Sequence, residues 1–253
     1  MNITLDGHTA LVTGANGGLG SHFARTLAKA GARVALAARR VETLREVEQE
    51  IRDAGGEGHS VALDVTRRES VAQAFEQATA ALGPVTVVVN NAGIAVTKPL
   101  LEHTEDDWNR VIEVNLTGAW RVAQEAARHM VKHGRGGSIV NIASILGLRV
   151  CAQVPGYAAS KAAVIHLTKA MALELARHRI RVNALAPGYV ETSMNRELFA
   201  TEAGQALIKR IPQRRIGDPG ELDAALLLLA SDAGSYATGT VLVVDGGQLV
   251  NTL

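Results

Sequence analysis

The sequence predicts an α/β fold, with a doubly wound parallel sheet of about seven strands and helices on both of its faces. Short apolar runs alternate with helix-forming segments, a glycine-rich turn follows the first apolar run, and polar residues follow several of the others. Parallel strands that are buried on both faces form continuous apolar runs, and helices connect them. No internal repeat, low-complexity tract or linker is present, so residues 1–253 are expected to form one domain.

The first half of the chain holds four predicted strands, which are the apolar runs at residues 9–13, 33–38, 60–63 and 85–89. Helical patterns separate them, and each of these patterns stops at a glycine, as helices commonly do. The predicted helices are residues 21–30, 41–54 and 70–82.

Three more strands are predicted in the second half, at residues 138–143, 180–186 and 240–244. A long helix is expected over residues 105–132, with Asn115 and Gly118 inside it. Residues 162–175 are mostly apolar and lack Pro and Gly, so a helix is expected there, with Tyr157 and Lys161 in its first turn. The last predicted helix covers residues 221–230.

Composition excludes several classes of function. The net charge of +1 argues against a nucleic-acid-binding protein, although short basic pairs such as Arg39-Arg40 and Arg214-Arg215 occur. The longest apolar run, residues 224–230, is too short to span a bilayer, and the N-terminal residues lack the apolar segment of a signal peptide. Cys151 is the only cysteine, so no intrachain disulfide can form. We therefore expect a cytoplasmic protein without a membrane or nucleic-acid partner.

The glycine-rich turn is the first candidate binding site. Gly14, Gly17, Gly18 and Gly20 lie between a predicted strand and a predicted helix. Glycines let the backbone approach a pyrophosphate, and the helix N-terminus supplies N–H donors and a positive dipole. This context favours dinucleotide binding over a plain tight turn.

Ligands in such sheets bind beyond the carboxyl ends of the strands. Five residues lie just past predicted strand ends and should converge there: Gly14, Asp64, Asn91, Ser144 and Pro187.

Tyr157 and Lys161 are the candidate catalytic pair. They are four residues apart, so on a helix they share a face. A cation beside a phenol lowers the phenol pKa from its usual ~10 and makes it a better acid and base near neutral pH. One such pair alone is a weak signal, because Tyr-x-x-x-Lys occurs by chance.

These motifs together resemble the short-chain dehydrogenase/reductase family over nearly the whole chain. The glycine motif Thr-Gly-x-x-x-Gly-x-Gly is matched by Thr13, Gly14, Gly18 and Gly20. The run Asn90-Asn91-Ala92-Gly93 and the closing Val244-Asp245-Gly246-Gly247 also look like family positions. The resemblance implies a Rossmann fold and a nicotinamide-dependent oxidoreductase.

The family's catalytic set is matched by Asn115, Ser144, Tyr157 and Lys161. The resemblance implies that Tyr157 exchanges a proton with the substrate oxygen and that Ser144 hydrogen-bonds this oxygen. It implies that Lys161 lowers the Tyr157 pKa and holds the nicotinamide ribose, while Asn115 holds a water of a proton relay. On its own, Asn115 would be interpreted as a satisfied polar core residue.

The resemblance also implies a cofactor-binding set that combines the glycine turn, the residues after later strands and two catalytic residues. It comprises Gly14, Asn16, Gly17, Gly18, Leu19, Gly20, Arg39, Arg40, Asp64, Val65, Asn91, Ala92, Gly93, Tyr157, Lys161, Pro187, Gly188, Val190 and Thr192. NADP(H) is expected to be preferred over NAD(H), because Ala38-Arg39-Arg40 holds arginines where an NAD-binding carboxylate would stand. Gly17 departs from the basic residue that many NADP-using relatives carry there.

The expected reaction interconverts a small-molecule ketone and secondary alcohol. Among relatives, the sequence looks most like the 3-oxoacyl-carrier-protein reductases; the alternatives are dehydrogenases of sugars, steroids or aryl ketones, and a non-catalytic NADP(H) sensor. Whether a carrier protein docks is left open. Residues 191–216 are expected to cover the site, with Met194, Leu198, Phe199, Leu207, Ile208 and Ile211 as apolar members.

Residues 162–175 are apolar almost all round, and family members often pair this helix across a two-fold axis, so a homotetramer is expected. His129 and His133 are four residues apart, a spacing that could bind zinc, but no third ligand is evident and no metal site is expected.

Overall fold

A computed structural model describes residues 3–191, 199 and 201–250 of the chain. Its sheet has seven strands in the order β3-β2-β1-β4-β5-β6-β7, and every adjacent pair is parallel. The strands are β1 (Thr9–Thr13), β2 (Arg33–Ala38), β3 (Gly58–Ala62), β4 (Val87–Asn90), β5 (Gly137–Ile142), β6 (Ile180–Pro187) and β7 (Val241–Val244). The predicted doubly wound sheet is confirmed, and its order changes direction between β1 and β4.

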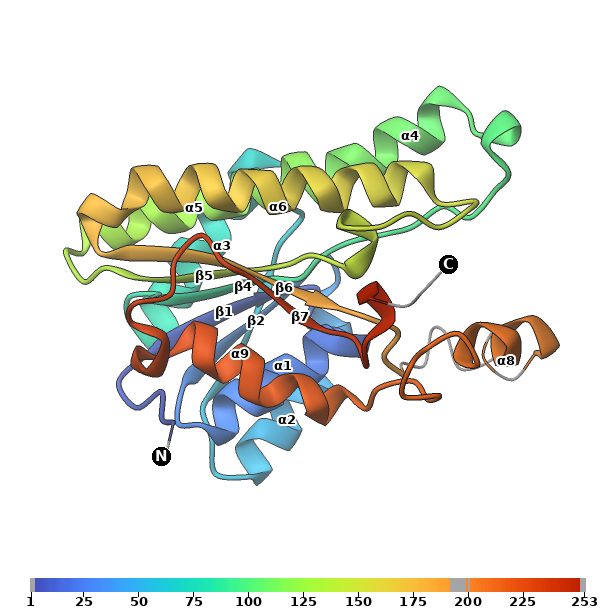
Figure 1. Ribbon diagram of the computed structural model, residues 1–253. Coiled ribbons are helices and arrows are strands. Elements are labelled where there is room, and N and C mark those ends of the chain that lie inside the picture. The colour runs from blue at the N-terminus through green and yellow to red at the C-terminus, as the bar shows by residue number, and fades with distance from the viewer. Residues whose placement is uncertain (1–2, 192–198, 200, 251–253) are drawn as a thin grey trace.

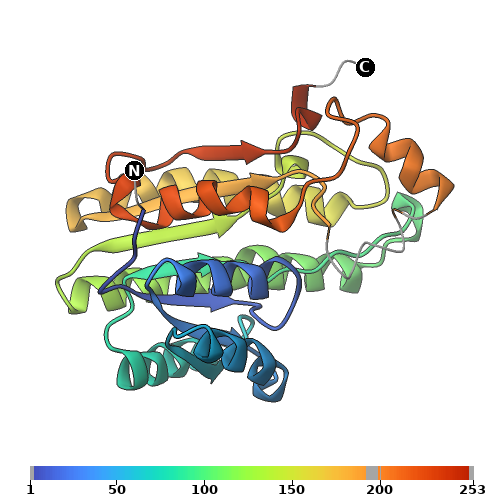
Figure 2. The same cartoon turned by 90° about the horizontal axis from the view of Figure 1, so that it is seen from below.

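Helices cover both faces of the sheet (Figure 1). The helices are α1 (Gly18–Lys29), α2 (Arg45–Asp53), α3 (Arg68–Leu82), α4 (Glu105–Ile112), α5 (Ala119–Lys132), α6 (Pro155–Leu175), α8 (Glu202–Ile208) and α9 (Asp223–Ala230). One apolar core lies between the sheet and α1, α2 and α9, and a second lies between the sheet and α3, α5 and α6. Figure 2 shows α9 running beside α1 across the first of these faces.

The helix predicted over residues 105–132 is interrupted. α4 ends at Ile112, a π-helical turn covers Glu113–Gly118, and α5 continues from Ala119. The turn contains Asn115, which is buried and hydrogen-bonds the backbone of Ile94, and Gly118, where an added Cβ would lie 2.7 Å from a Val65 methyl carbon. The close approach to neighbouring segments explains a local departure from α-helical spacing at this position.

Other boundaries move by one to four residues. α1 begins three residues before the predicted start at residue 21, and α2 begins at Arg45, four residues after the predicted start, because Val41–Leu44 form a 3₁₀ turn. β3 and β4 are shifted from the predicted ranges, and β7 begins one residue later. α6 begins at Pro155, because proline is well suited to the first helical position. α9 begins at Asp223, after a 3₁₀ turn over Pro219–Leu222.

None of the helices in the described part of the chain is long and apolar enough to cross a bilayer.

Candidate active site

A cavity of about 450 Å³ opens at the carboxyl edge of the sheet, beside the point where the strand order changes direction. Loops after β1, β2, β3 and β4 form it together with α4 and the π-helical turn. Its lining residues are Gly14, Asn16, Ala38, Arg39, Leu63, Asp64, Val65, Thr66, Ala92, Gly93, Ile94, Ala95, Arg110 and Val114.

The cavity brings together seven of the predicted cofactor residues: Gly14, Asn16, Arg39, Asp64, Val65, Ala92 and Gly93. Arg40, which is exposed, is not among the lining residues. Gly188 and Val190 follow β6, further along the same edge, and Thr192 lies outside the described residues.

Sequence reasoning missed several lining residues, including Arg110 and Val114. These two are four residues apart in one helical segment, so helical spacing alone could have placed both on the face that meets the cavity. Thr66 follows Asp64 by two residues and was also within reach of sequence reasoning.

The backbone of the glycine turn after β1 is closely packed. Gly14 has a φ of +66°, in the left-handed region that favours glycine. A Cβ at Gly20 would lie 2.0 Å from the Gly14 carbonyl oxygen, so only glycine fits there. α1 begins at Gly18, and its N-terminal N–H groups face the turn.

Asn91 holds this turn in place. Its Nδ2 donates to the Thr13 carbonyl at 3.0 Å, while the Thr13 hydroxyl accepts from the Asn91 and Ala92 backbone N–H groups. The Asn91 side chain therefore ties the loop after β4 to the end of β1. This positioning contact gives a structural reason for asparagine at this place.

Asp64 and Arg39 share one wall of the cavity. Burial acts to raise the pKa of Asp64, but hydrogen bonds from Thr66 and the nearby charges of Arg39 and Arg67 together hold it below its usual value. The carboxylate accepts the Thr66 hydroxyl at 2.7 Å and the Thr66 backbone N–H at 2.9 Å. Asp64 is thus ionised and fixed near neutral pH, as a hydrogen-bond acceptor on the cavity wall.

The predicted catalytic residues lie at the same edge. Ser144 follows β5, and its hydroxyl accepts from Leu146 N at 3.1 Å. Tyr157 and Lys161 stand one turn apart on α6, with the Lys161 Nζ 5.5 Å from the centre of the Tyr157 ring. Gly93 brings the two sites together, because a Cβ built there would lie 3.6 Å from the Lys161 Nζ.

The pKa of Tyr157 runs against the expectation that Lys161 would lower it. Burial raises the pKa of Tyr157, and a hydrogen bond with Ser144 only partly opposes this. Lys161 is itself buried, which lowers its pKa to about 8, and its Nζ donates to the Ile142 carbonyl at 2.7 Å. In this geometry desolvation, rather than the charge of Lys161, has the largest effect on the pKa of the Tyr157 phenol.

Asn115 makes contacts that satisfy its whole side chain. Its Oδ1 accepts from Ile94 N at 2.8 Å, and its Nδ2 donates to Ile94 O at 2.8 Å and to the Ser160 hydroxyl at 3.1 Å. Ser160 in turn donates to the Tyr157 carbonyl at 2.7 Å. Asn115 therefore joins the loop after β4 to the first turn of α6, beside Lys161.

His129 has a structural role. Its Nε2 accepts from the Val85 backbone N–H at 3.1 Å, and burial followed by the nearby His133 and Lys132 lowers its pKa to about 4. In the part of the chain that the structure describes, no three His, Cys, Asp or Glu side chains gather closely enough to hold a metal ion.

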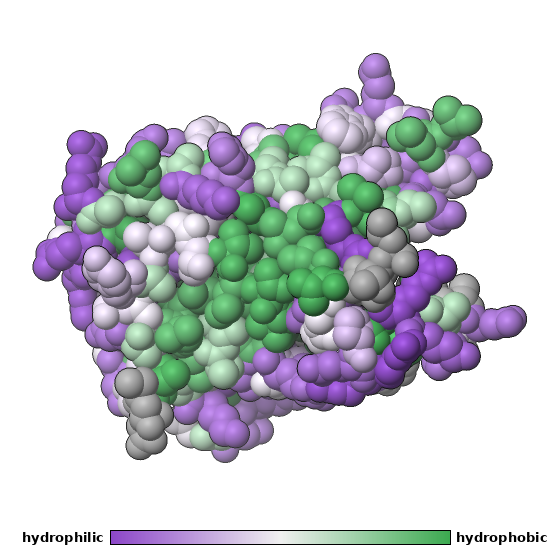
Figure 3. Space-filling view, in the orientation of Figure 1, coloured by the Kyte–Doolittle hydropathy of each residue, from purple (hydrophilic) through white to green (hydrophobic). Residues whose placement is uncertain are grey.

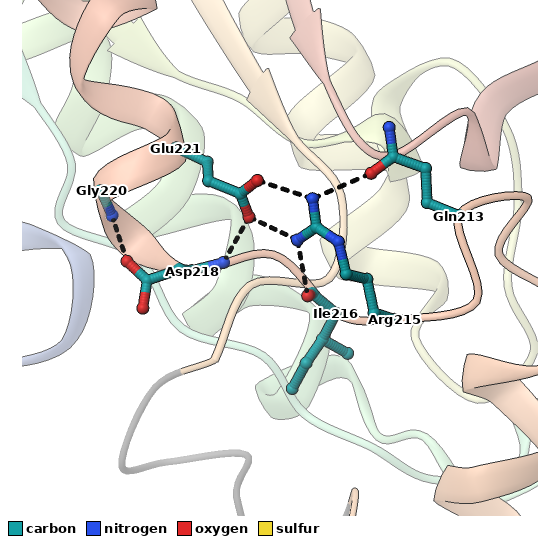
Figure 4. Close-up of polar contacts among 6 residues, drawn as sticks. All are labelled: Gln213, Arg215, Ile216, Asp218, Gly220 and Glu221. Atoms are coloured by element: carbon teal, nitrogen blue, oxygen red, sulfur yellow. Dashed lines mark hydrogen bonds and ion pairs between the residues drawn. The ribbon is translucent and has the colours of Figure 1, made fainter.

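The segment expected to cover the site packs onto the loop after β6. Phe199 is 5% exposed and lies edge-on to Tyr189, with ring centres 5.4 Å apart, and Ile211 is fully buried. Met194 and Leu198 lie outside the described residues. Figure 4 shows Arg215 with two hydrogen bonds to Glu221, at 2.6 and 2.7 Å, which attach the end of this segment to the turn before α9.

The cavity has the features that a phosphorylated nicotinamide dinucleotide requires. Gly14 lines the cavity in a left-handed conformation, and the glycines of the turn carry no side chain that would block a pyrophosphate from the backbone N–H groups. Arg39 supplies a cation where a ribose phosphate would lie, and Asp64 supplies a fixed acceptor. The residues present therefore fit the cofactor that the sequence predicts.

Comparisons with known proteins agree with this geometry. A family model described as enoyl-(acyl carrier protein) reductase matches residues 14–248. The 3-oxoacyl-[acyl-carrier-protein] reductase of Thermotoga maritima is 40% identical over 246 residues, which are 97% of this chain and 99% of that protein.

Two solved structures have the same fold. A short-chain type dehydrogenase/reductase from Mycobacterium marinum is 43% identical, with a TM-score of 0.92 over 98% of this chain and 97% of the other. A gluconate 5-dehydrogenase from Burkholderia cenocepacia, solved in complex with NADP and tartrate, is 39% identical. Its TM-score is 0.94, over 99% of this chain and 98% of the other.

Proposed function

The chain belongs to the short-chain dehydrogenase/reductase family, and on that premise we propose that Tyr157 is the acid and base of an NADP(H)-dependent interconversion of a ketone and a secondary alcohol. The observation that carries the proposal is the placement of Ser144, Tyr157 and Lys161 next to a cavity that fits the cofactor.

The protein's part in the reaction is proton transfer and positioning. The Tyr157 hydroxyl donates its proton to the carbonyl oxygen during reduction and takes it back during oxidation. Ser144, which is close enough to the Tyr157 hydroxyl to lower its pKa, is placed to donate to the same oxygen and orient it. The bound nicotinamide supplies or accepts the hydride.

Lys161 has an electrostatic role at Tyr157, and Asn115 has a positioning role. The Lys161 ammonium is held by the Ile142 carbonyl beside the Tyr157 ring, so its charge opposes the desolvation of a phenolate. Asn115 fixes the start of α6 through Ser160, and with it the position of the phenol.

Cofactor binding is assigned to the residues of the cavity. The turn from Gly14 to Gly20 would hold the pyrophosphate, Arg39 the ribose phosphate, and Asp64 with Val65 the adenine. Arg40, Pro187, Gly188, Val190 and Thr192 complete the proposed set on the evidence of the family resemblance.

The substrate is proposed to be a 3-oxoacyl thioester or another small ketone. The Thermotoga relative supports the thioester, and the Burkholderia structure supports a sugar acid. A protein that senses NADP(H) without turnover is disfavoured, because a sensor would not need the contacts that Ser144, Tyr157 and Lys161 retain.

We further propose a homotetramer in the cytoplasm. Leu173 on α6 is 83% exposed. β7 forms an edge of the sheet, and all four of its residues are partly exposed. Figure 3 shows hydrophobic residues gathered in the middle of this face of the molecule. Apolar surface of this kind is typical of an interface between copies.

A panel of ketones with NADPH tests the proposed function. Oxidation of NADPH that depends on both the ketone and Tyr157 is expected, with 5-keto-D-gluconate and an acetoacetyl thioester as first members. Tight NADPH binding without turnover of any ketone in the panel would support the sensor instead.

A further inference from the structure

A polar cluster is formed at the carboxyl edge of the sheet by loops that do not line the cofactor cavity. The cavity is built by the loops after β1 to β4, and Ser144 follows β5. The loops after β5, β6 and β7 contribute the cluster, which we define as Arg149, Cys151, Tyr189 and Gln248. Because β5, β6 and β7 are adjacent in the sheet, these loops meet on one side of Ser144.

Contacts within the cluster join three segments far apart in sequence. Arg149 donates to the Gln248 carbonyl, and the Gln248 Oε1 accepts from Tyr189 N at 3.2 Å. The Cys151 side chain is close enough to the Tyr189 hydroxyl to affect its pKa. Burial and then Cys151 raise the pKa of Tyr189, while the positive charge of Arg149 acts in the opposite direction.

The cluster is part of the substrate side of the site. Arg149 and Cys151 lie on the loop that connects Ser144 to Tyr157, the two residues proposed to contact the reacting oxygen. Tyr189 packs against Phe199, which belongs to the segment that covers the site. We take the substrate to extend from Ser144 and Tyr157 toward this cluster, because the loop that carries Arg149 joins these two residues.

Among the residues that the structure describes, Arg149 is a cation without an acidic partner. Arg149 is half-buried and forms no ion pair with any carboxylate of the described residues, and within this part of the chain its one side-chain hydrogen bond is to a backbone carbonyl. Arg215, on the covering segment, is instead bound by both oxygens of Glu221 (Figure 4). A guanidinium has five donors, so Arg149 keeps donors for a ligand.

We propose that Arg149 is the anion-recognition residue of the substrate site, and that the substrate is a small keto or hydroxy acid whose carboxylate it binds. This inference rests on the proposed function and narrows its substrate class. A guanidinium binds a carboxylate through two parallel hydrogen bonds, and a neighbouring phenol adds a further polar contact. An uncharged acyl thioester would leave this partly desolvated cation without a partner.

Binding of tartrate and threitol to the full-length protein saturated with NADP⁺ tests the inference by calorimetry. The two ligands share a four-carbon polyol skeleton, and only tartrate carries carboxylates. Tartrate is expected to bind and threitol is not. Arg149→Ala should weaken tartrate binding about 10-fold or more, the factor that corresponds to about 1.4 kcal/mol. Arg149→Lys should lose less, because it keeps the charge without the fork geometry.

Arg177→Ala is the matched control, because Arg177 is an exposed arginine in the 3₁₀ turn after α6. It should leave the tartrate Kd unchanged, and circular dichroism of each variant verifies folding. Equal tartrate affinity in the wild type, Arg149→Ala and Arg149→Lys would overturn the inference, and so would threitol binding as tightly as tartrate.

The turnover panel separates this inference from the proposed function. With 5-keto-D-gluconate, Arg149→Ala should raise KM about 10-fold or more with little change in kcat, whereas the kinetics of an uncharged acetoacetyl N-acetylcysteamine thioester should not change. Equal losses with both substrates would assign Arg149 a purely structural role. Absence of turnover with every ketone would contradict the proposed function, while the calorimetry would still decide whether Arg149 binds an anion.

Discussion

The Lys161 ammonium lies 5.5 Å from the centre of the Tyr157 ring and donates to the Ile142 carbonyl at 2.7 Å. Both side chains are affected by burial, which lowers the pKa of Lys161 to about 8 and raises that of Tyr157. A carbonyl oxygen is a weak partner for a buried cation, so the positive charge is held at a cost in folding free energy. This cost leads to a prediction about stability and pH.

Lys161→Met should raise the free energy of unfolding, compared with the wild type, more at pH 7 than at pH 10. The folded pKa of Lys161 is about 8 and lies below its ordinary value of 10.5, so between these values the unfolded chain binds more protons. Stability of the wild type therefore rises with pH across this window, by roughly 2–3 kcal/mol from pH 7 to pH 10 at ~1.36 kcal/mol per pKa unit. Methionine cannot titrate and should show no such rise.

Urea unfolding of both proteins at pH 7 and pH 10 gives the difference between their free energies of unfolding, and the effect is the change of this difference with pH. The contributions of groups that titrate in both proteins cancel in this difference. A difference that stays constant with pH would mean that the pKa of Lys161 is not lowered by burial.

Tyr157→Phe should abolish turnover and leave cofactor binding intact. The variant keeps the aromatic ring on α6 and removes only the hydroxyl that hydrogen-bonds Ser144. General acid catalysis contributes about 10²- to 10⁴-fold, so kcat should fall by at least about 100-fold. NADPH fluorescence titration should give an unchanged Kd. Activity within about tenfold of the wild type would remove Tyr157 from the role of acid.

Gly20→Ala should weaken cofactor binding, whereas Gly17→Ala should be tolerated. A Cβ at Gly20 would lie 2.0 Å from the Gly14 carbonyl oxygen, so the turn must move, at a cost of typically 1–3 kcal/mol for overpacking. Gly17 has extended backbone, with φ of 167°, and no atom lies within 4 Å of an added Cβ. Thermal unfolding and NADPH titration of both variants measure the contrast, and equal behaviour would mean that the turn is looser than the structure indicates.

Sequence patterns predicted the parallel sheet well because strands buried on both faces leave continuous apolar runs. They also predicted that Gly14, Asp64 and Asn91 would meet at one edge, since parallel strands end together. The π-helical turn around Asn115 was not predictable, because it depends on the contact of Gly118 with Val65, which no local pattern records.

The chemistry of Tyr157 and Lys161 was only partly predictable for a related reason. Helical spacing placed the two residues on one face, but the pKa of each depends on burial by distant segments. Similarly, Arg149 has no recognisable motif. Its place beside Tyr189 and Gln248 arises only when the loops after β5, β6 and β7 come together.

The native protein should be a tetramer, and Leu173→Glu should reduce its size. Leu173 on α6 is 83% exposed, and an interface between copies would cover this apolar side chain. A charge at a buried interface position costs far more than at an exposed one. Light scattering should give about four times the chain mass of 26.6 kDa for the wild type and a smaller mass for the variant. A wild-type mass near 26.6 kDa would contradict the assembly.

NADPH should be preferred over NADH, and Arg39 should carry the preference. Arg39 and Arg40 are both exposed, but only Arg39 lies on the cavity wall, close enough to Asp64 to lower the pKa of its carboxyl group. A charge-assisted hydrogen bond to the 2′-phosphate is worth about 1.5–3 kcal/mol. For the Arg39 contact we use about 2–3 kcal/mol. At ~1.4 kcal/mol per decade this energy corresponds to a preference for NADPH over NADH of roughly 30- to 150-fold in kcat/KM.

Arg39→Ala should therefore bring the two cofactors close to equal kcat/KM, and Arg40→Ala serves as the matched control that should keep most of the preference. Gly17→Arg should increase the preference, because its backbone is extended and the space around it is open. Steady-state kinetics with NADPH and NADH across the four proteins measures these ratios. A ratio that is unchanged by Arg39→Ala but lost in Arg40→Ala would transfer the role to Arg40. Equal or better use of NADH by the wild type would contradict the preference altogether.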